Sequence, residues 1–195
     1  MQKQTTIKKA DLPNLREAYL KVLYWFFSYP ETSVGLSDLS EQLVIAKKTA
    51  KIIVNQFVQE GFLKVEVLGK LWRISCNRTH AYNFTKKIPY NLDMIYSSAI
   101  LLEIHKHFPN PKAVILFGSY RKGDDTEKSD IDIAVEIPGK EEIKMIELGV
   151  INQFGYRTTV KINLFIFSDR KKIDVNVFSN IANGIVLEGF LEVHP

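Results

Sequence analysis

The sequence predicts an α/β protein with two parts, a basic and mainly helical front part and a back part built on apolar strands. Residues 1–90 contain 14 Lys and Arg against 7 Asp and Glu, a net charge of +7, whereas residues 91–195 contain 12 and 15, a net charge of −3. Apolar residues recur at helical spacing in the front part, and short apolar runs typical of buried strands occur in the back part. A chain of 195 residues can form two small domains or one domain of medium size.

Three helices are expected in the front part. The first is predicted over Leu12 to Tyr29, where apolar and aromatic residues recur at helical spacing, and it ends at Pro30. The second is short and is expected to begin with Ser37 as its N-cap. The third is predicted over Lys47 to Glu60, and Gly61 is expected to end it.

A β-hairpin is expected after the third helix. Its strands are Phe62 to Leu68 and Leu71 to Cys76, joined by a turn at Gly69-Lys70. Three helices followed by a hairpin resemble the winged helix-turn-helix domain of transcriptional regulators, over about residues 12–78. The resemblance implies that the third helix enters the major groove of double-stranded DNA with its first residues. Winged helices also dock proteins, so a docking module is the alternative.

The residues that this resemblance assigns to DNA are basic or polar, and they lie at the start of the third helix or near the wing. They are Lys47, Lys48, Thr49, Lys51, Lys70 and Arg73. A basic front part suits a polyanion, and such side chains contact phosphates more often than base edges. The bland alternative is that the lysines are only the solvated face of an amphipathic helix. Because winged helices often read paired half-sites, a homodimer is expected.

The chemistry of the back part is concentrated between two apolar runs. The first, Ala113 to Phe117, ends at Gly118-Ser119, and the second, Ile131 to Ile137, begins between Asp130 and Asp132. Alternate residues of a strand point to the same face, so these two carboxylates would lie side by side. Like charges this close repel unless a cation lies between them, and Mg²⁺ is commonly held by carboxylates plus substrate phosphates. A small-residue turn that opens a short helix favours an anion. The pattern therefore predicts nucleotide chemistry.

The order Gly118-Ser119, Arg121 to Gly123 and Ser129-Asp130-Ile131-Asp132 resembles the minimal nucleotidyltransferases of the DNA polymerase beta-like superfamily, over about residues 109–190. The resemblance implies a mixed sheet flanked by helices. It implies nucleoside triphosphate binding by Gly118, Ser119, Arg121 and Ser129, and binding of Mg²⁺ or Mn²⁺ by Asp130 and Asp132, which are also catalytic. Two metal ions then serve the attacking hydroxyl and the leaving pyrophosphate. The alternatives are an acidic surface turn and, for Arg121, an ion pair with Asp124 or Asp125.

The third acidic position of the family falls on Asn163. It lies in a strand expected over Thr159 to Phe167, after a helix near residues 140–154. An amide oxygen can bind Mg²⁺ but carries no charge, and a neutral amide is a poor base. We therefore expect nucleotide and metal binding with weak or absent transfer. Lys161, two residues earlier, is either solvated or within reach of a phosphate.

These features favour a DNA-binding transcriptional regulator, with a winged helix-turn-helix domain at residues 1–88 and a nucleotidyltransferase domain at residues 89–195. The alternative is an active enzyme that transfers a nucleotide to a protein, as the antitoxins that adenylylate their toxin do, or to a small-molecule hydroxyl. Whether the chain is an enzyme stays open. A third hypothesis is structural: both domains serve dimerisation and partner docking, and the nucleotide site is a relict.

The remaining segments predict connections and exclude some classes of protein. Asn77 to Pro89 is expected to be a connector without periodicity, and Asn91 to His107 a helix that packs on the sheet. A helix near residues 178–184 and a closing segment, Ile185 to Val193, are expected at the end. One cysteine, Cys76, excludes an internal disulfide framework. Without an apolar run near 18 residues or an apolar leader, a cytoplasmic protein that does not contact membranes is expected.

Overall fold

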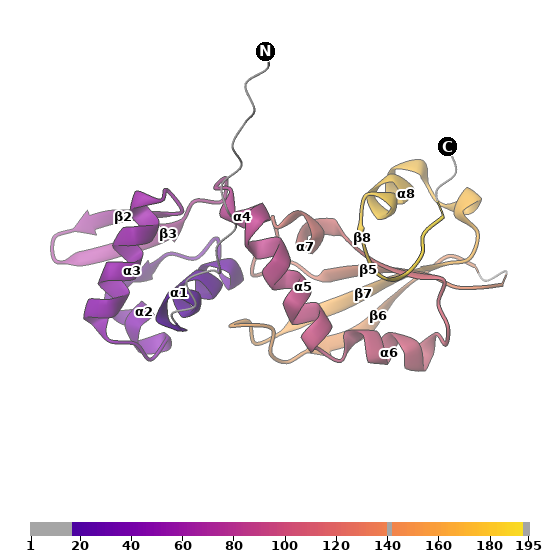
Figure 1. Ribbon diagram of the computed structural model, residues 1–195, viewed down its shortest axis with the longest axis horizontal. Helices are drawn as coiled ribbons and strands as arrows, with labels where there is room; N and C mark the ends of the chain where they lie inside the picture. The colour runs from indigo at the N-terminus through magenta and orange to yellow at the C-terminus, as the bar shows by residue number, and fades with distance from the viewer. Residues whose placement is uncertain (1–16, 140–141, 193–195) are drawn as a thin grey trace, which may run out of the picture.

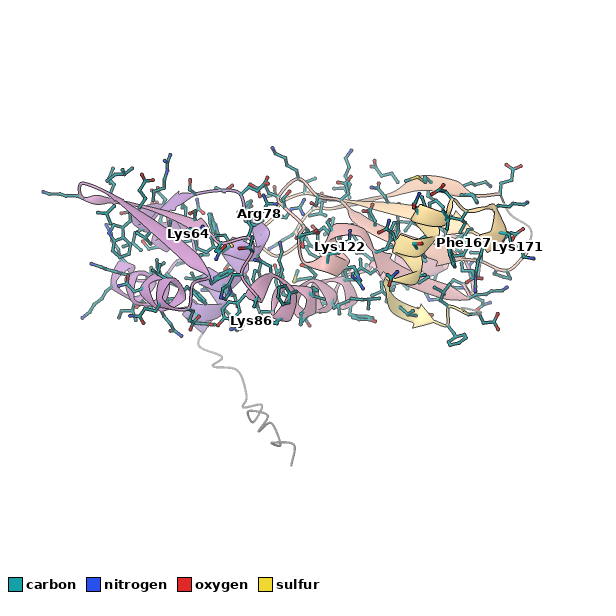
Figure 2. All side chains as sticks on the ribbon, turned by 90° about the horizontal axis from the view of Figure 1, so that it is seen from above. Lys64, Arg78, Lys86, Lys122, Phe167 and Lys171 are labelled. Carbon is teal, nitrogen blue, oxygen red and sulfur yellow. The ribbon has the colours of Figure 1, made fainter. Side chains whose placement is uncertain are left out.

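The computed structural model describes residues 17–139 and 142–192. Its elements form two groups that lie side by side along the long axis of the molecule (Figure 1). In the view from above, Lys64 lies on the front group and Lys171 near the far end of the back group (Figure 2). None of the helices in the described ranges is long and apolar enough to cross a membrane.

The front group consists of three helices and a three-stranded antiparallel sheet. Its elements are α1 (Glu17–Ser28), β1 (Val34–Gly35), α2 (Leu36–Gln42), α3 (Lys47–Gln59), β2 (Leu63–Leu68) and β3 (Leu71–Cys76). The strand order is β1-β3-β2, and β2 and β3 form the predicted hairpin. The third helix also lies where the sequence predicts it. The predicted start of the first helix at Leu12 lies outside the described residues.

Aromatic side chains fill the core of the front group. Trp25, Phe26 and Phe27 of α1 are all buried, and Phe27 and Phe57 each pack edge-on against Phe62. Burying a large apolar side chain stabilises a fold by about 1.5–3 kcal/mol. These rings therefore hold the three helices against the hairpin.

The prediction that Ser37 is the N-cap of the second helix is wrong. The N-cap is Gly35, and Ser37 is the second residue of α2. The reason is β1, a short strand that the sequence pattern does not reveal, because it leads directly into the helix. The Ser37 hydroxyl instead accepts a hydrogen bond of 2.7 Å from the Lys47 ammonium.

The connecting region is more helical than the sequence predicts. It contains α4 (Tyr82–Thr85), and α5 (Lys87–Ser97) begins inside the expected connector. The single helix expected from Asn91 to His107 is two helices, because Ser98 has an extended backbone before α6 (Ile100–His107) begins. Pro89 is tolerated since it lies in the first turn of α5, where a backbone N–H has no helical partner.

Helix α5 belongs to both groups. Its Tyr90 is buried in the front core and stacks on Tyr24 with ring centroids 4.4 Å apart. Five residues later, Ile95 is buried in the core of the back group, and Met94 packs against both cores. Figure 1 shows α5 running between the two groups.

The back group is built on a five-stranded mixed sheet. Its elements are β4 (Ala113–Phe117), α7 (Gly118–Lys122), β5 (Ile131–Glu136), β6 (Lys144–Ile151), β7 (Val160–Phe167), a 3₁₀ turn (Arg170–Lys172), α8 (Val175–Ala182) and β8 (Ile185–Gly189). The strand order is β6-β7-β5-β4-β8, in which only β5 and β7 are parallel. The mixed sheet flanked by helices that the resemblance implies is confirmed.

The two faces of the sheet are covered differently. One face packs its apolar side chains, such as Ile133 and Leu164, against α5 and α6. The other face packs Ala134 and Phe167 against α8. Residues of alternate parity along β5 and β7 therefore belong to opposite faces, and Asp132 and Asn163 share the face of α8.

The helix expected near residues 140–154 is wrong. Most of this segment is the edge strand β6, which pairs antiparallel with β7. Its register shifts between Glu147 and Gly149, and this bulge interrupts the alternation of apolar residues. All eight residues of β6 are exposed or half-buried, so the segment lacks the buried apolar run that marks β4 and β5.

Candidate functional site

Two carboxylates and one amide converge at one end of the back sheet. Asp132 of β5 is in register with Asn163 of β7. The Asn163 amide nitrogen lies 3.3 Å from a carboxylate oxygen of Asp130 and 3.3 Å from one of Asp132. The structure therefore brings together the three residues that the sequence assigns to metal binding and catalysis.

The electrostatics of the pair favour a cation between them. Burial raises the pKa of the Asp132 carboxyl, the hydrogen bond from Asn163 opposes that rise, and the nearby Asp130 charge adds to it. A raised pKa means that this environment disfavours the ionised form of the carboxyl. A bound cation would relieve both the desolvation and the repulsion between the carboxylates.

Gly118 allows the chain to pass directly over Asp132. It has a φ of +71°, and a Cβ atom at this position would lie 2.6 Å from the Asp132 Oδ2 atom. Only glycine satisfies both the backbone angle and this close approach. Gly118 begins α7, so it positions that short helix next to the carboxylates.

The donor set fits a hard divalent cation such as Mg²⁺. Asp130 and Asp132 supply two carboxylates, and a half-turn of the Asn163 amide group would present its oxygen. Among the described residues, no three His, Cys, Asp or Glu side chains are close enough together to hold a metal ion by themselves. The two aspartates alone would therefore leave ligand positions open, and substrate phosphates can fill such positions.

The residues predicted to bind nucleotide lie around this site, but they differ in whether their side chains already have a partner. The Ser129 hydroxyl accepts a hydrogen bond of 2.9 Å from the Thr126 backbone N–H, so it stabilises a turn. Ser119 and Arg121 are partly exposed in α7. Within the described residues no carboxylate forms an ion pair with Arg121, so the alternative pairing with Asp124 or Asp125 is not seen.

Sequence reasoning missed Arg157, which joins the two halves of the site. Its guanidinium is buried, and it donates hydrogen bonds to the Tyr120 hydroxyl of α7 and, at 2.8 Å, to the Ser129 carbonyl. It thereby fixes α7 to the start of β5. Arg157 lies in a polar loop without periodicity, so no sequence signal indicates that it is buried.

A buried ion pair joins α5 to the loop that follows α7. Lys87 of α5 is 3.0 Å from an Asp125 carboxylate oxygen and also donates to the Asp125 carbonyl. Asn91 donates to the other Asp125 oxygen and to the Tyr120 carbonyl. Burial raises the pKa of Asp125, and the Lys87 ammonium counteracts this. The network fixes α5 to the loop that follows α7.

Lys161 has an ion-pair partner that the sequence does not predict. Its ammonium lies 3.8 Å from a Glu147 carboxylate oxygen across the β6–β7 pair, and both side chains are about half exposed. The solvated state of Lys161, one of the two alternatives, agrees with this exposure.

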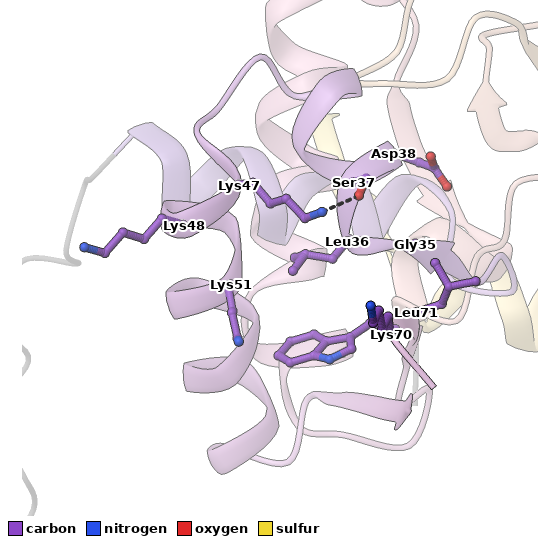
Figure 3. A pocket seen from close by; sticks show the side chains of 10 residues that line it. Gly35, Leu36, Ser37, Asp38, Lys47, Lys48, Lys51, Lys70 and Leu71 are labelled. Carbon is purple, nitrogen blue, oxygen red and sulfur yellow. Dashed lines mark hydrogen bonds between the residues drawn. The ribbon is translucent and has the colours of Figure 1, made fainter. Parts of the chain in front are cut away.

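The lysines predicted to bind DNA surround a cavity of the front group. The cavity has a volume of about 510 Å³, and its lining includes Lys47, Lys48, Lys51, Lys70 and Trp72. Lys47 points toward Ser37, whereas Lys48 points away from it (Figure 3). The Lys51 ammonium lies 5.1 Å from the centre of the Trp72 ring.

The two other residues predicted to bind DNA do not line this cavity. Thr49 is exposed on α3. Arg73 lies on β3, where its guanidinium is 3.7 Å from a Glu66 carboxylate oxygen. The structure therefore groups four of the six predicted residues around one hollow of the surface.

The comparisons with known proteins agree with the fold of the back group. Residues 97–183, a little under half of the chain, match the family model of the nucleotidyltransferase domain. The match includes Gly118, both carboxylates and Asn163. This part of the chain is therefore a nucleotidyltransferase domain, as the sequence resemblance implies. The search of curated proteins found no match.

Proposed function

We propose that the protein is a DNA-binding transcriptional regulator whose nucleotidyltransferase domain binds a nucleoside triphosphate with Mg²⁺ and transfers the nucleotide slowly. The observation that carries the proposal is the convergence of Asp130 and Asp132 on the amide of Asn163 within the matched domain. Two carboxylates support metal and triphosphate binding. The neutral amide at the third position argues against rapid transfer.

In this proposal Asp130 and Asp132 hold the metal ion, and Gly118 and Ser119 lie beside the phosphates. Mg²⁺ supplies charge neutralisation between the carboxylates and the triphosphate when it is bound. Arg121 lies in α7, forms no ion pair with the described residues, and is proposed to contact a phosphate. Ser129 acts through its turn, because its hydroxyl already accepts the Thr126 N–H.

Transfer is expected to be slow because the attacking hydroxyl of the acceptor must be deprotonated. The attacking hydroxyl must lose a proton, and a carboxylate at the third position would accept it. The Asn163 amide cannot, and general base catalysis typically contributes about 10²–10⁴ in rate. The alternative function, rapid transfer to a protein or small-molecule hydroxyl, requires another acceptor for that proton.

The DNA-binding part of the proposal rests on the front group. Its order of helices and strands, with a hairpin after α3, supports the proposal of a winged helix-turn-helix domain. The lysines at the start of α3 and at the hairpin turn gather around one cavity. We propose that they bind the phosphates of double-stranded DNA, and that a cytoplasmic homodimer reads paired half-sites. The division at residues 88 and 89 stays a prediction.

The nucleotide part is tested with α-³²P-labelled ATP, GTP, CTP and UTP, with Mg²⁺ or Mn²⁺, with and without cell lysate. We expect metal-dependent binding that is lost in Asp130→Asn/Asp132→Asn, with little transferred label. Rapid transfer that depends on Asp130 would instead support the alternative and identify the acceptor class. Binding that survives the double substitution would refute the metal-site assignment.

The DNA part is tested by the salt dependence of binding to duplex DNA. Replacing Lys47, Lys48 and Lys51 by Ala should weaken binding and reduce the slope of log K against log salt by about 2.7, if each lysine neutralises one phosphate. The matched control replaces Lys112, Lys171 and Lys172, three exposed lysines of the back group. Equal slopes for the two triple variants would remove α3 from the interface.

A further inference from the structure

Glu147 occupies the position opposite Asn163 on the edge strand. In the antiparallel β6–β7 pair, Glu147 faces Asn163, and in the parallel β5–β7 pair, Asn163 is in register with Asp132. Directly opposed residues of neighbouring strands project from the same face of a sheet. Glu147, Asn163 and Asp132 therefore form one row across three adjacent strands, on the face that carries the site.

The carboxylate of Glu147 is only loosely held. Its partner is the Lys161 ammonium at 3.8 Å, and the side chains of Glu147 and Lys161 are 52% and 56% exposed. Exposed ion pairs of this kind contribute little, typically about 0–1 kcal/mol. A rotation of the Glu147 side chain away from Lys161 therefore costs little.

The bulge beside Glu147 keeps this residue on the face of the site. The register of β6 shifts directly after Glu147, so Leu148 is the extra residue and packs against the core of the opposite face. Bulges are common next to active sites, where they set the direction of a side chain. In a regular ladder continued back from the Gly149–Ile162 pair, Leu148 rather than Glu147 would lie opposite Asn163.

We propose that Glu147 supplies a third carboxylate ligand to the metal ion from the edge strand, while the position that would accept the proton of the attacking hydroxyl stays the neutral amide of Asn163. This inference rests on the proposed nucleotide site. The ligand is a divalent cation bound together with a triphosphate. Neighbouring strands lie about 4.8 Å apart, and a glutamate side chain is long enough to reach across one strand over the short Asn163 amide. In the free protein the same carboxylate pairs with Lys161.

The competing explanation is that Glu147 serves only to pair with Lys161 on the edge strand. It is tested by Mn²⁺ binding in the presence of α,β-methylene-ATP, measured from the free Mn²⁺ signal in electron paramagnetic resonance. Glu147→Gln should bind Mn²⁺ about ten-fold more weakly. The matched control, Glu103→Gln, breaks an exposed Lys106 pair of the same kind on α6 and should leave the affinity unchanged. An affinity of Glu147→Gln equal to wild type would refute the inference.

Direct ligation is separated from a field effect by isotope labelling. Both other carboxylates of the site are aspartates, so protein made by cell-free synthesis with [δ-¹³C]glutamate reports glutamate alone. Electron–nuclear double resonance of bound Mn²⁺ should show a ¹³C coupling that disappears in Glu147→Gln. A wild-type protein without that coupling overturns the inference even if the substitution weakens binding.

The same titrations distinguish failure of this inference from failure of the proposed function. If Mn²⁺ and the analogue bind wild type but not Asp132→Asn, the nucleotide site stands whatever Glu147 does. If neither wild type nor Asp132→Asn shows coupled binding of the metal and the analogue, the proposed site itself fails, and the role of Glu147 fails with it.

Discussion

At the scale of single residues, Asn163 decides how the site behaves without a metal ion. Its amide donates to both carboxylates, so it partly neutralises a repulsion that a third acid would increase. The same amide cannot accept a proton. Asn163 therefore stabilises the metal-free protein but cannot act as the general base of the transfer reaction.

Asn163→Asp should reverse this balance. We expect the free energy of unfolding in EDTA to fall by about 1–2 kcal/mol, because two hydrogen bonds are lost and a third charge is added. Excess Mg²⁺ should raise the stability of this variant more than that of wild type, and transfer of labelled nucleotide should rise by about 100-fold. Urea unfolding with and without metal measures the first effect. Unchanged stability in EDTA would show that the amide contacts contribute nothing.

The pKa of the Cys76 thiol leads to a separate prediction. Burial raises this pKa to about 12 from the ordinary value of 9.0, and nearby Lys87 and Arg78 oppose the rise. At pH 8 only about one thiol in ten thousand is ionised, so alkylation by iodoacetamide should be far slower in the folded protein than in urea. Because the folded state holds the proton more tightly, this group stabilises the fold below pH 9 and loses that contribution as the pH rises toward 12. Equally fast alkylation of folded and unfolded protein would contradict the assignment.

At the scale of elements, the start of α7 depends on one glycine. Gly118→Ala should lower Mn²⁺-dependent nucleotide binding by about ten-fold, because the new Cβ would displace the Asp132 carboxylate. The control is Gly69→Ala in the front hairpin, where φ is +63° but no atom lies within 4 Å of the added Cβ. That variant should lose about 1 kcal/mol of stability from its backbone alone and keep nucleotide binding. Isothermal titration with both variants separates backbone strain from the clash at the site.

The elements that the sequence predicts are those whose signals are local. Strands such as Ala113 to Phe117 are short apolar runs, and the Asp130-x-Asp132 spacing fixes a shared face without knowledge of the fold. The edge strand β6 was missed because its residues are exposed or half-buried and form no buried apolar run, and β1 because two residues carry no periodicity. The contacts of Arg157 were missed for another reason, since they join residues far apart in the sequence.

At the scale of the whole molecule, a buried ion pair ties α5 to the nucleotidyltransferase domain. Lys87→Met should destabilise the protein by about 3–5 kcal/mol, because it leaves the Asp125 carboxylate buried without its cation. Lys106→Met breaks the exposed pair with Glu103 and should cost less than about 1 kcal/mol. Urea denaturation of the two variants measures the difference. Equal effects would mean that the buried pair contributes no more than a surface pair.

The front and back groups also touch beside the site. The Tyr29 hydroxyl donates to the Tyr156 carbonyl at 2.6 Å, and the Thr32 hydroxyl donates to a Glu127 carboxylate oxygen at 2.9 Å. Tyr156 precedes Arg157, and Glu127 lies in the turn before Ser129. The segment that follows α1 therefore contacts both segments that hold the start of β5.

Helix α5 limits how this chain can exchange parts with other proteins during evolution. A recombination junction at residue 88 would leave Tyr24 without the ring of Tyr90 that stacks on it. A junction after Ser97 would remove Ile95 from the back core. Neither half can be replaced by an unrelated module unless the incoming segment reproduces half of α5. The two activities proposed for this protein are thus expected to be inherited together.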